Sequence, residues 1–163
     1  MKVFYLLIVS LFGISGCYSF KDVSIPPDVK TVRVSYLENR ASYINPQLSP
    51  QLTERLRQKI NNQTRLTLIT GEDAHYDISG SVTGYNVSTA GISDQQAATN
   101  RLSVTVHIIF KNRLDEKANF EADVLRNFDF NANLSLQAAE AQLSEDILKN
   151  MTDEIFNRIF SNW

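Results

Sequence analysis

The sequence is poor in the residues that build covalent cross-links and most metal sites. It has one cysteine, Cys17, and two histidines, His75 and His107, among 163 residues. A lone cysteine excludes an intrachain disulfide and a multi-thiolate zinc site, and neither histidine has a second ligand at metal-binding spacing. We therefore interpret both histidines as surface residues, and we expect no metal ion and no cofactor.

The motifs of common enzyme classes are also missing. The chain contains no G-x-S-x-G nucleophile motif, no P-loop and no H-E-x-x-H motif. Two pairs of adjacent acids, Glu72-Asp73 and Asp115-Glu116, fall in predicted turns, where solvation explains them better than acid–base chemistry. These absences predict that the protein is not an enzyme.

A surplus of positive charge is missing as well. Sixteen Lys and Arg residues stand against eighteen Asp and Glu residues, which gives a formal net charge of −2. A general nucleic-acid binder usually carries a basic surplus, so we expect no nucleic-acid partner.

Four basic residues do gather around the first predicted helix and the strand after it. They are Arg55, Arg57, Lys59 and Arg65. This basic group is our candidate site for an anionic ligand such as a lipid phosphate. The alternative is a solvated helix face, because Glu54 lies among them.

The N-terminal residues have the pattern of a bacterial lipoprotein signal. Lys2 precedes an apolar run from Val3 to Leu11, and the small residues Ser15 and Gly16 stand directly before Cys17. The run is too short to cross a bilayer of roughly 30 Å as a helix, but it suits the apolar part of a signal peptide. The alternatives are an ordinary secretory signal with a chance cysteine and an N-terminal core strand.

This pattern divides the chain into three parts. We expect residues 1–16 to be removed as a signal peptide. Cys17 would then be lipidated and would become the mature N-terminus, and residues 17–30 would form a short tether that Pro26-Pro27 stiffens. Residues 31–163 are enough for a single domain. Each buried methylene of the lipid adds about 0.8 kcal/mol to membrane affinity, so two or three acyl chains would hold the protein firmly.

Apolar periodicity predicts an α+β domain. Alternation predicts strands over 31–37, 65–70, 76–87, 100–110 and 119–130, and a polar connection over 88–99. We expect Val104, Val106 and Ile108 to be buried, and we expect Gly80 and Gly84 to mark a bulge or a close approach of another segment.

Two helices are predicted from apolar residues three and four apart. Ser49 should cap the first, with Pro50 at its first position and Asn61-Asn62 at its end. Asn133 or Ser135 should cap the second, which would bury Leu143 and Ile147. The order of elements predicts a two-layer sandwich: a mainly antiparallel sheet of four to five strands with both helices packed on one face.

Scattered sequence patches resemble a known family. They are Gly16–Phe20, Ser24–Pro27, Leu48–Leu56, Gly80–Tyr85 and Asn157–Trp163. Together they are similar to the lipopolysaccharide-assembly lipoproteins of the LptE family, in their Bacteroidetes-type form. Only Cys17, the lipidation site, can be matched to a functional residue of that family.

The resemblance implies a non-enzymatic lipoprotein anchored by its lipid on the periplasmic side of the outer membrane. Such a protein plugs a large β-barrel translocon, helps to assemble it, and helps to deliver lipopolysaccharide to the cell surface. Its partners would be the barrel, lipopolysaccharide and the membrane itself. The alternative is an accessory lipoprotein that activates a peptidoglycan synthase or serves a secretion or transport machine, since the same signal and element order would suit it.

Overall fold

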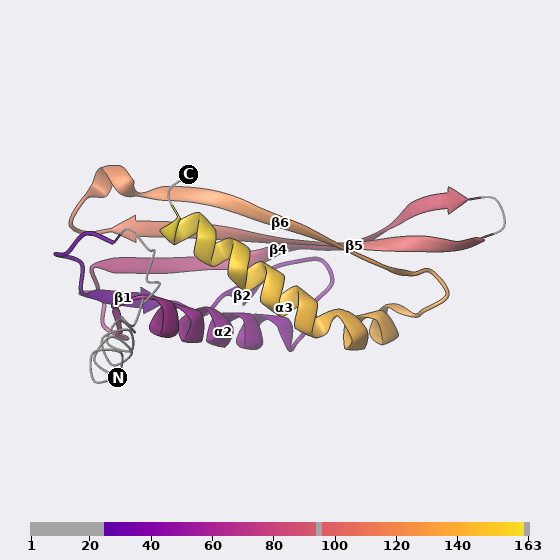
Figure 1. Ribbon diagram of the computed structural model, residues 1–163, viewed down its shortest axis with the longest axis horizontal. Helices are drawn as coiled ribbons and strands as arrows, with labels where there is room; N and C mark the ends of the chain where they lie inside the picture. Colours follow the sequence, from indigo (N-terminus) through magenta and orange to yellow (C-terminus); the bar gives the residue numbers. More distant parts are fainter. Residues whose placement is uncertain (1–24, 94–95, 162–163) are drawn as a thin grey trace, which may run out of the picture.

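The computed structural model describes residues 25–93 and 96–161. The predicted signal peptide and Cys17 therefore lie outside the described residues. Two helices form one layer and a six-stranded sheet forms the other (Figure 1). The elements are β1 (Thr31–Val34), β2 (Glu38–Asn39), α2 (Leu48–Gln63), β3 (Thr67–Leu68), β4 (Tyr76–Ser93), β5 (Gln96–Asn112), η1 (Glu116–Ala118), β6 (Phe120–Asn131) and α3 (Leu136–Phe160).

The sheet is mixed, with the strand order β3-β1-β4-β5-β6 and with β2 also paired to β4. The long strands β4, β5 and β6 are antiparallel, whereas β1 runs parallel to both β3 and β4. The predicted α+β sandwich is confirmed. The strand that the sequence pattern missed is β2, which is only two residues long and pairs in parallel with Ser81 and Val82.

The largest departure from prediction is the segment 88–99. We expected a polar connection there, but β4 continues to Ser93 and β5 begins at Gln96, so the two strands form one long hairpin. Figure 1 shows this hairpin extending past the ends of both helices. Residues 86–91 are exposed. This part of β4 is held by hydrogen bonds to β5 and not by burial of side chains. Its sequence therefore lacks the apolar alternation of a half-buried strand.

The core lies between the helices and the inward face of the sheet. Val104, Val106 and Ile108 are fully buried, as predicted, and Ile147 of α3 is buried with them. Leu143 is only partly buried, contrary to prediction, because Ala139 is the only fully buried residue of α3 before Ile147. The inward face of α2 is made of Leu52, Leu56 and Ile60, none of which is exposed.

The two helices begin differently. Ser135 caps α3 as predicted, because its hydroxyl accepts a hydrogen bond from the Ala138 N–H at 3.2 Å. The prediction for Ser49 is wrong: α2 begins at Leu48, and the Ser49 hydroxyl is buried without a hydrogen-bond partner. Pro50 is tolerated in the first turn because backbone N–H groups there have no partner within the helix.

Gly80 and Gly84 mark both of the expected features. The pairing of β4 with β5 shifts register between Val82 and Gly84, as in a β-bulge. At Gly80 the neighbouring strand comes close, so that an added Cβ atom would lie 2.2 Å from the carbonyl oxygen of His107.

Part of the segment predicted as a tether belongs to the core. Ile25 and Val29 are buried among the core residues. The backbone N–H of Val29 donates to the carbonyl of Pro26 at 3.1 Å, which closes a turn after Pro26-Pro27.

Candidate functional site

The structure divides the predicted basic group among several internal partners. Arg55 and Lys59 lie one helical turn apart on α2, and both reach α3. The Arg55 guanidinium lies 2.5 Å from Glu145 and the Lys59 ammonium 2.9 Å from Asp153. Lys59 also lies 5.0 Å from the centre of the Phe156 ring. These two cations therefore tie the helices together.

Arg57 and Arg65 point elsewhere. Arg57 donates two hydrogen bonds to the carbonyl oxygen of Val34, at 2.7 and 3.3 Å. Arg65 donates to the carbonyl oxygen of Ile25. All four basic residues thus have partners inside the protein, and they do not converge on one pocket.

The outward face of the sheet carries polar pairs between neighbouring strands. The guanidinium of Arg33 on β1 forms two hydrogen bonds with Asp77 on β4, at 2.7 and 2.9 Å. The same arrangement recurs between Arg101 on β5 and Asp129 on β6. The pKa of each arginine is raised, first by the hydrogen bond with its carboxylate partner.

Further pairs on β5 and β6 continue this outward face, which we call the open face. His107 Nδ1 lies 2.8 Å from Asp123 Oδ1, and Ser103 donates to the Asn127 amide oxygen at 2.8 Å. Opposite charges facing each other across strands stabilise a sheet and leave little net charge. The open face is therefore largely charge-balanced, and it also carries exposed apolar side chains such as Leu125.

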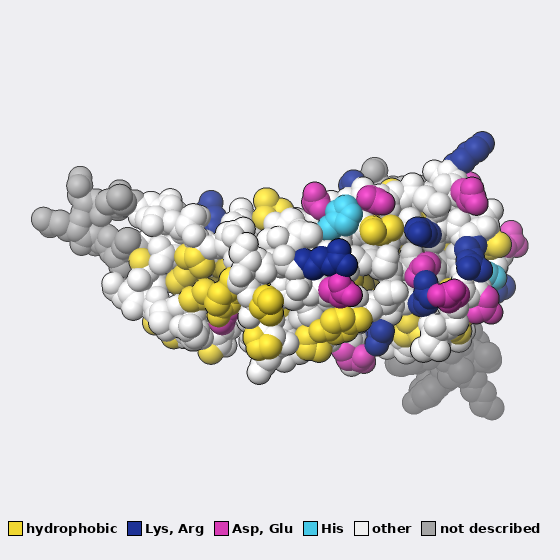
Figure 2. Space-filling model, turned by 180° about the vertical axis from the view of Figure 1, so that it is seen from behind, with side chains coloured by type: hydrophobic (Ala, Val, Ile, Leu, Met, Phe, Trp, Pro, Cys, Tyr) yellow, Lys and Arg dark blue, Asp and Glu magenta, His cyan; other side chains and the backbone are white. Residues whose placement is uncertain are grey.

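The hairpin of β4 and β5 differs from the rest of the molecule in charge. Between Ile78 and Asn100 the sequence contains a single charged residue, Asp94. In the view from behind, charged side chains gather at the end away from the hairpin, and the hairpin end is mostly uncharged (Figure 2). Beyond Val82, β5 is the only strand paired with β4 among the residues that the structure describes.

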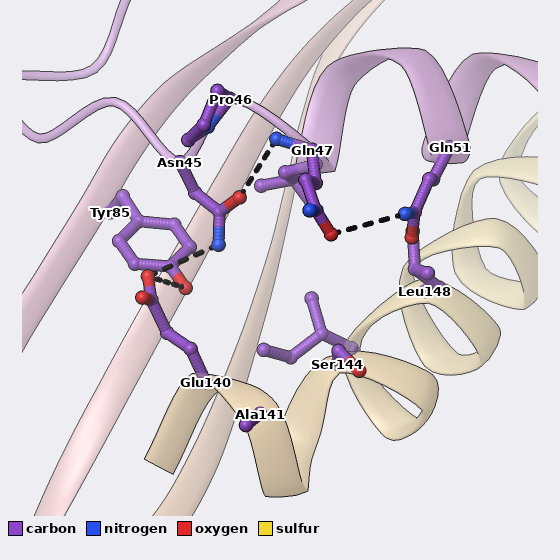
Figure 3. Close-up of a pocket in the computed structure, with 11 residues that line it drawn as sticks. Asn45, Pro46, Gln47, Gln51, Tyr85, Glu140, Ala141, Ser144 and Leu148 are labelled. Atoms are coloured by element: carbon purple, nitrogen blue, oxygen red, sulfur yellow. Dashed lines mark hydrogen bonds between the residues drawn. The ribbon is translucent and has the colours of Figure 1, made fainter. Parts of the chain in front are cut away.

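A pocket of about 270 Å³ lies where α2 and α3 meet the start of the hairpin (Figure 3). Its polar wall is organised around Glu140 of α3. The Glu140 carboxylate accepts hydrogen bonds from the Tyr85 hydroxyl at 2.8 Å, the Asn45 amide at 3.1 Å and the Tyr43 hydroxyl at 3.3 Å.

Tyr85, which lines the pocket, is stacked on Tyr43, with ring centres 5.4 Å apart. Tyr85 is almost fully buried. Burial, and then the hydrogen bond to Glu140, strongly raise the pKa of Tyr85, so its hydroxyl stays protonated and remains a donor. The pKa of Tyr43 is raised as well, first by burial and then by the charge of Glu140.

Sequence reasoning missed this site because its parts are far apart in the chain. Asn45 and Glu140 are separated by 95 positions, and Tyr85 and Glu140 by 55. None of these residues belongs to a local motif. The one indirect signal is Glu140 itself, an acid next to the buried Ala139 in the predicted second helix.

Two kinds of site are absent from the described part of the chain. No group of three His, Cys, Asp or Glu side chains could hold a metal ion among residues 25–93 and 96–161. Within those same ranges no helix is long and apolar enough to cross a membrane.

Comparison with known proteins identifies the family. The model of the LptE family, described as lipopolysaccharide-assembly, matches residues 29–159. The chain belongs to this family. The match covers every strand, all of α2 and all of α3 except Phe160, so it extends over the fold and is not limited to a short motif. No curated protein matches the sequence.

Solved structures show the same fold at low sequence identity. A minor lipoprotein from Acinetobacter baumannii superposes with a TM-score of 0.53 at 16% identity, over 80% of this chain and 91% of that one. A putative neuraminyllactose-binding hemagglutinin homolog from Helicobacter pylori gives a TM-score of 0.54 at 13% identity, over 87% of each chain. At these identities the likeness concerns the fold alone.

Proposed function

We propose that this LptE-family protein is a non-enzymatic outer-membrane lipoprotein that plugs and helps to assemble the β-barrel translocon delivering lipopolysaccharide to the cell surface. The observation that carries the proposal is the family match over residues 29–159. The partners would be the barrel, lipopolysaccharide and, through the lipid on Cys17, the periplasmic side of the outer membrane.

The surface chemistry supports a position inside a barrel. The lumen of a large outer-membrane barrel is polar and wet, so a protein that fills it needs a polar surface without a large net charge. The open face meets this need through its cross-strand pairs, such as Arg33 with Asp77 and Arg101 with Asp129. The hairpin, which has Asp94 as its single charged residue between Ile78 and Asn100, extends past the helices.

The basic group remains our candidate for contact with lipid phosphates. Arg55 is more than a third exposed in its side chain and could exchange Glu145 for a phosphate through charge-assisted hydrogen bonds. Arg57 and Lys59 are only partly exposed, whereas Arg65 is exposed, and each of the three would have to give up its present partner. The four residues should therefore contribute unequally, with Arg55 and Arg65 contributing more than Arg57 and Lys59.

Binding of purified lipopolysaccharide to the full chain in detergent micelles tests this site. Arg55→Gln should weaken binding more than Lys59→Gln does. Equal and unchanged binding in both variants, and in a variant with all four residues neutralised, would remove the site but leave the proposed function standing.

Depletion of the protein tests the function itself. We expect less lipopolysaccharide at the cell surface and less correctly folded translocon barrel. Normal surface lipopolysaccharide with an intact barrel would contradict the proposal, and it would favour an accessory role for a peptidoglycan synthase or for a secretion or transport machine.

A further inference from the structure

Glu140 differs from every other acidic residue in the described part of the chain. Nine of those acids form ion pairs with a basic residue. The described acids without such a pair are exposed, with the single exception of Glu140, which is partly buried. A carboxylate removed from water without a cation is costly unless other groups stabilise its charge.

Three neutral donors stabilise the Glu140 charge without neutralising it. Tyr85 and Asn45 donate to Oε1, and Tyr43 donates to Oε2. A carboxylate has about four acceptor sites, so one of them, on Oε2, remains available. The site therefore has one fixed negative charge, held in place by its neighbours, with capacity for one more donor.

The rest of the pocket suits the end of a long polar side chain. Glu140 is the only charged residue among the described residues that line it, and the side chains of Gln47, Gln51 and Ser144 line it as well. Figure 3 shows these side chains around the opening between the two helices. Its volume of about 270 Å³ is below the usual range for small-molecule sites, roughly 300–1,000 Å³.

We propose that this pocket binds the guanidinium group of an arginine side chain from a partner protein. A guanidinium has five donors in a planar fork, which can meet the Glu140 carboxylate and the neighbouring amide oxygens together. Tyr85 also lines the pocket, and its hydroxyl holds the carboxylate in place for such a partner. The proposal goes beyond the proposed function, since any partner that inserts an arginine would satisfy it.

An anionic ligand does not fit this pocket. The Glu140 charge would repel a phosphate, and none of the described residues that line the cavity is basic. The pocket is therefore chemically distinct from the basic group, and the two sites would take different partners.

A titration of the full chain in detergent micelles with N-acetyl-arginine methylamide tests the proposal, with backbone amide NMR shifts as the readout. The corresponding citrulline derivative has nearly the same shape without the charge. We expect saturable shifts at Gln51, Tyr85 and Ala141 with the arginine probe, and binding at least about tenfold weaker with citrulline, since a charge-assisted hydrogen bond is lost.

Two variants locate the binding charge. Glu140→Gln should lower the affinity for the arginine probe by at least about tenfold. Asp146→Asn removes the same charge from an exposed, unpaired position on α3 and should change the affinity by less than about twofold. If Glu140→Gln fails to fold, the comparison of arginine with citrulline on the unaltered protein still tests whether binding needs the positive charge.

Three results would overturn the proposal. One is the absence of saturable shifts, and another is equal binding of citrulline. The third is tighter binding of phosphoethanolamine than of the arginine probe, which would assign the pocket to a lipid-borne amine instead of a protein side chain. Failure of any of these tests would leave the lipopolysaccharide-assembly role untouched, because that role does not depend on this pocket.

Discussion

Arg101 and Asp129 lie directly opposite each other on β5 and β6, and their side chains form two hydrogen bonds. Arg101 Nε donates to Oδ1 at 2.7 Å and Nη2 donates to Oδ2 at 2.9 Å. The hydrogen bond and then the charge of Arg101 lower the pKa of Asp129 below its usual value of 3.8. This pair is the clearest electrostatic feature of the open face.

The pair predicts a specific pH dependence. Because the folded-state pKa of Asp129 is depressed, its contribution to stability is present above the unfolded pKa and is lost as the pH falls through the folded pKa. NMR titration should place the Asp129 midpoint below 3.8. Arg101→Met should raise that midpoint, whereas Arg113→Met, which removes an exposed charge after β5, should not. An unchanged midpoint in Arg101→Met would show that the pair does not form.

Burial of Val106 predicts that a charge there unfolds the domain. Val106 is fully buried between the sheet and the helices. An unpaired buried charge costs several kcal/mol, against a total stability of roughly 5–15 kcal/mol. Val106→Asp should therefore abolish the cooperative thermal transition, and Ser103→Asp, on the open face of the same strand, should retain it. Near-wild-type melting of Val106→Asp would contradict the assignment of the strand faces.

Gly80 predicts a different kind of destabilisation. A Cβ atom there would meet the backbone carbonyl of His107, so the two central strands would have to move apart. Gly80→Ala should lower the free energy of unfolding by about 1–3 kcal/mol in denaturant titrations. Gly91→Ala is the matched control on the same strand, because nothing lies within 4 Å of its added Cβ. Equal stability of the two variants would rule out the close approach at Gly80.

Cys17 carries the predicted membrane anchor. Cys17→Ala should block both lipid attachment and removal of the signal, since the thiol is the group that accepts the lipid. Acyl labelling and membrane fractionation measure these two outcomes, and Ser19→Ala serves as a neighbouring control. A Cys17→Ala protein that still matures and partitions into membranes would contradict lipid anchoring at this residue.

The sequence predicted those elements whose burial leaves a periodic pattern. Apolar and polar residues alternate from Leu102 to Ile108, and every second residue of β5 from Leu102 to Phe110 is buried. Ser135 also predicted the start of α3 correctly, because its side chain makes the capping hydrogen bond itself.

The sequence could not reveal structure that depends on distant partners. Residues 88–91 of the hairpin are exposed, and the segment 88–99 is held by pairing between its two strands, so its hydropathy gave no sign of a strand. The helix start at Leu48 depends on the loop before it, where the Asn45 side chain accepts from the Gln47 N–H at 3.0 Å. The pocket around Glu140 needs the full tertiary fold.

The most direct test of the central claim is site-specific photo-crosslinking from the open face in intact cells. A photoreactive residue in place of Asn127, an exposed position on β6, should crosslink to a large outer-membrane β-barrel, identified by mass spectrometry. The same residue at Gln58, an exposed position of α2, reports on the opposite layer. Barrel crosslinks from Asn127 are the predicted result. Crosslinks from both positions only to an inner-membrane synthase or pump would contradict the account.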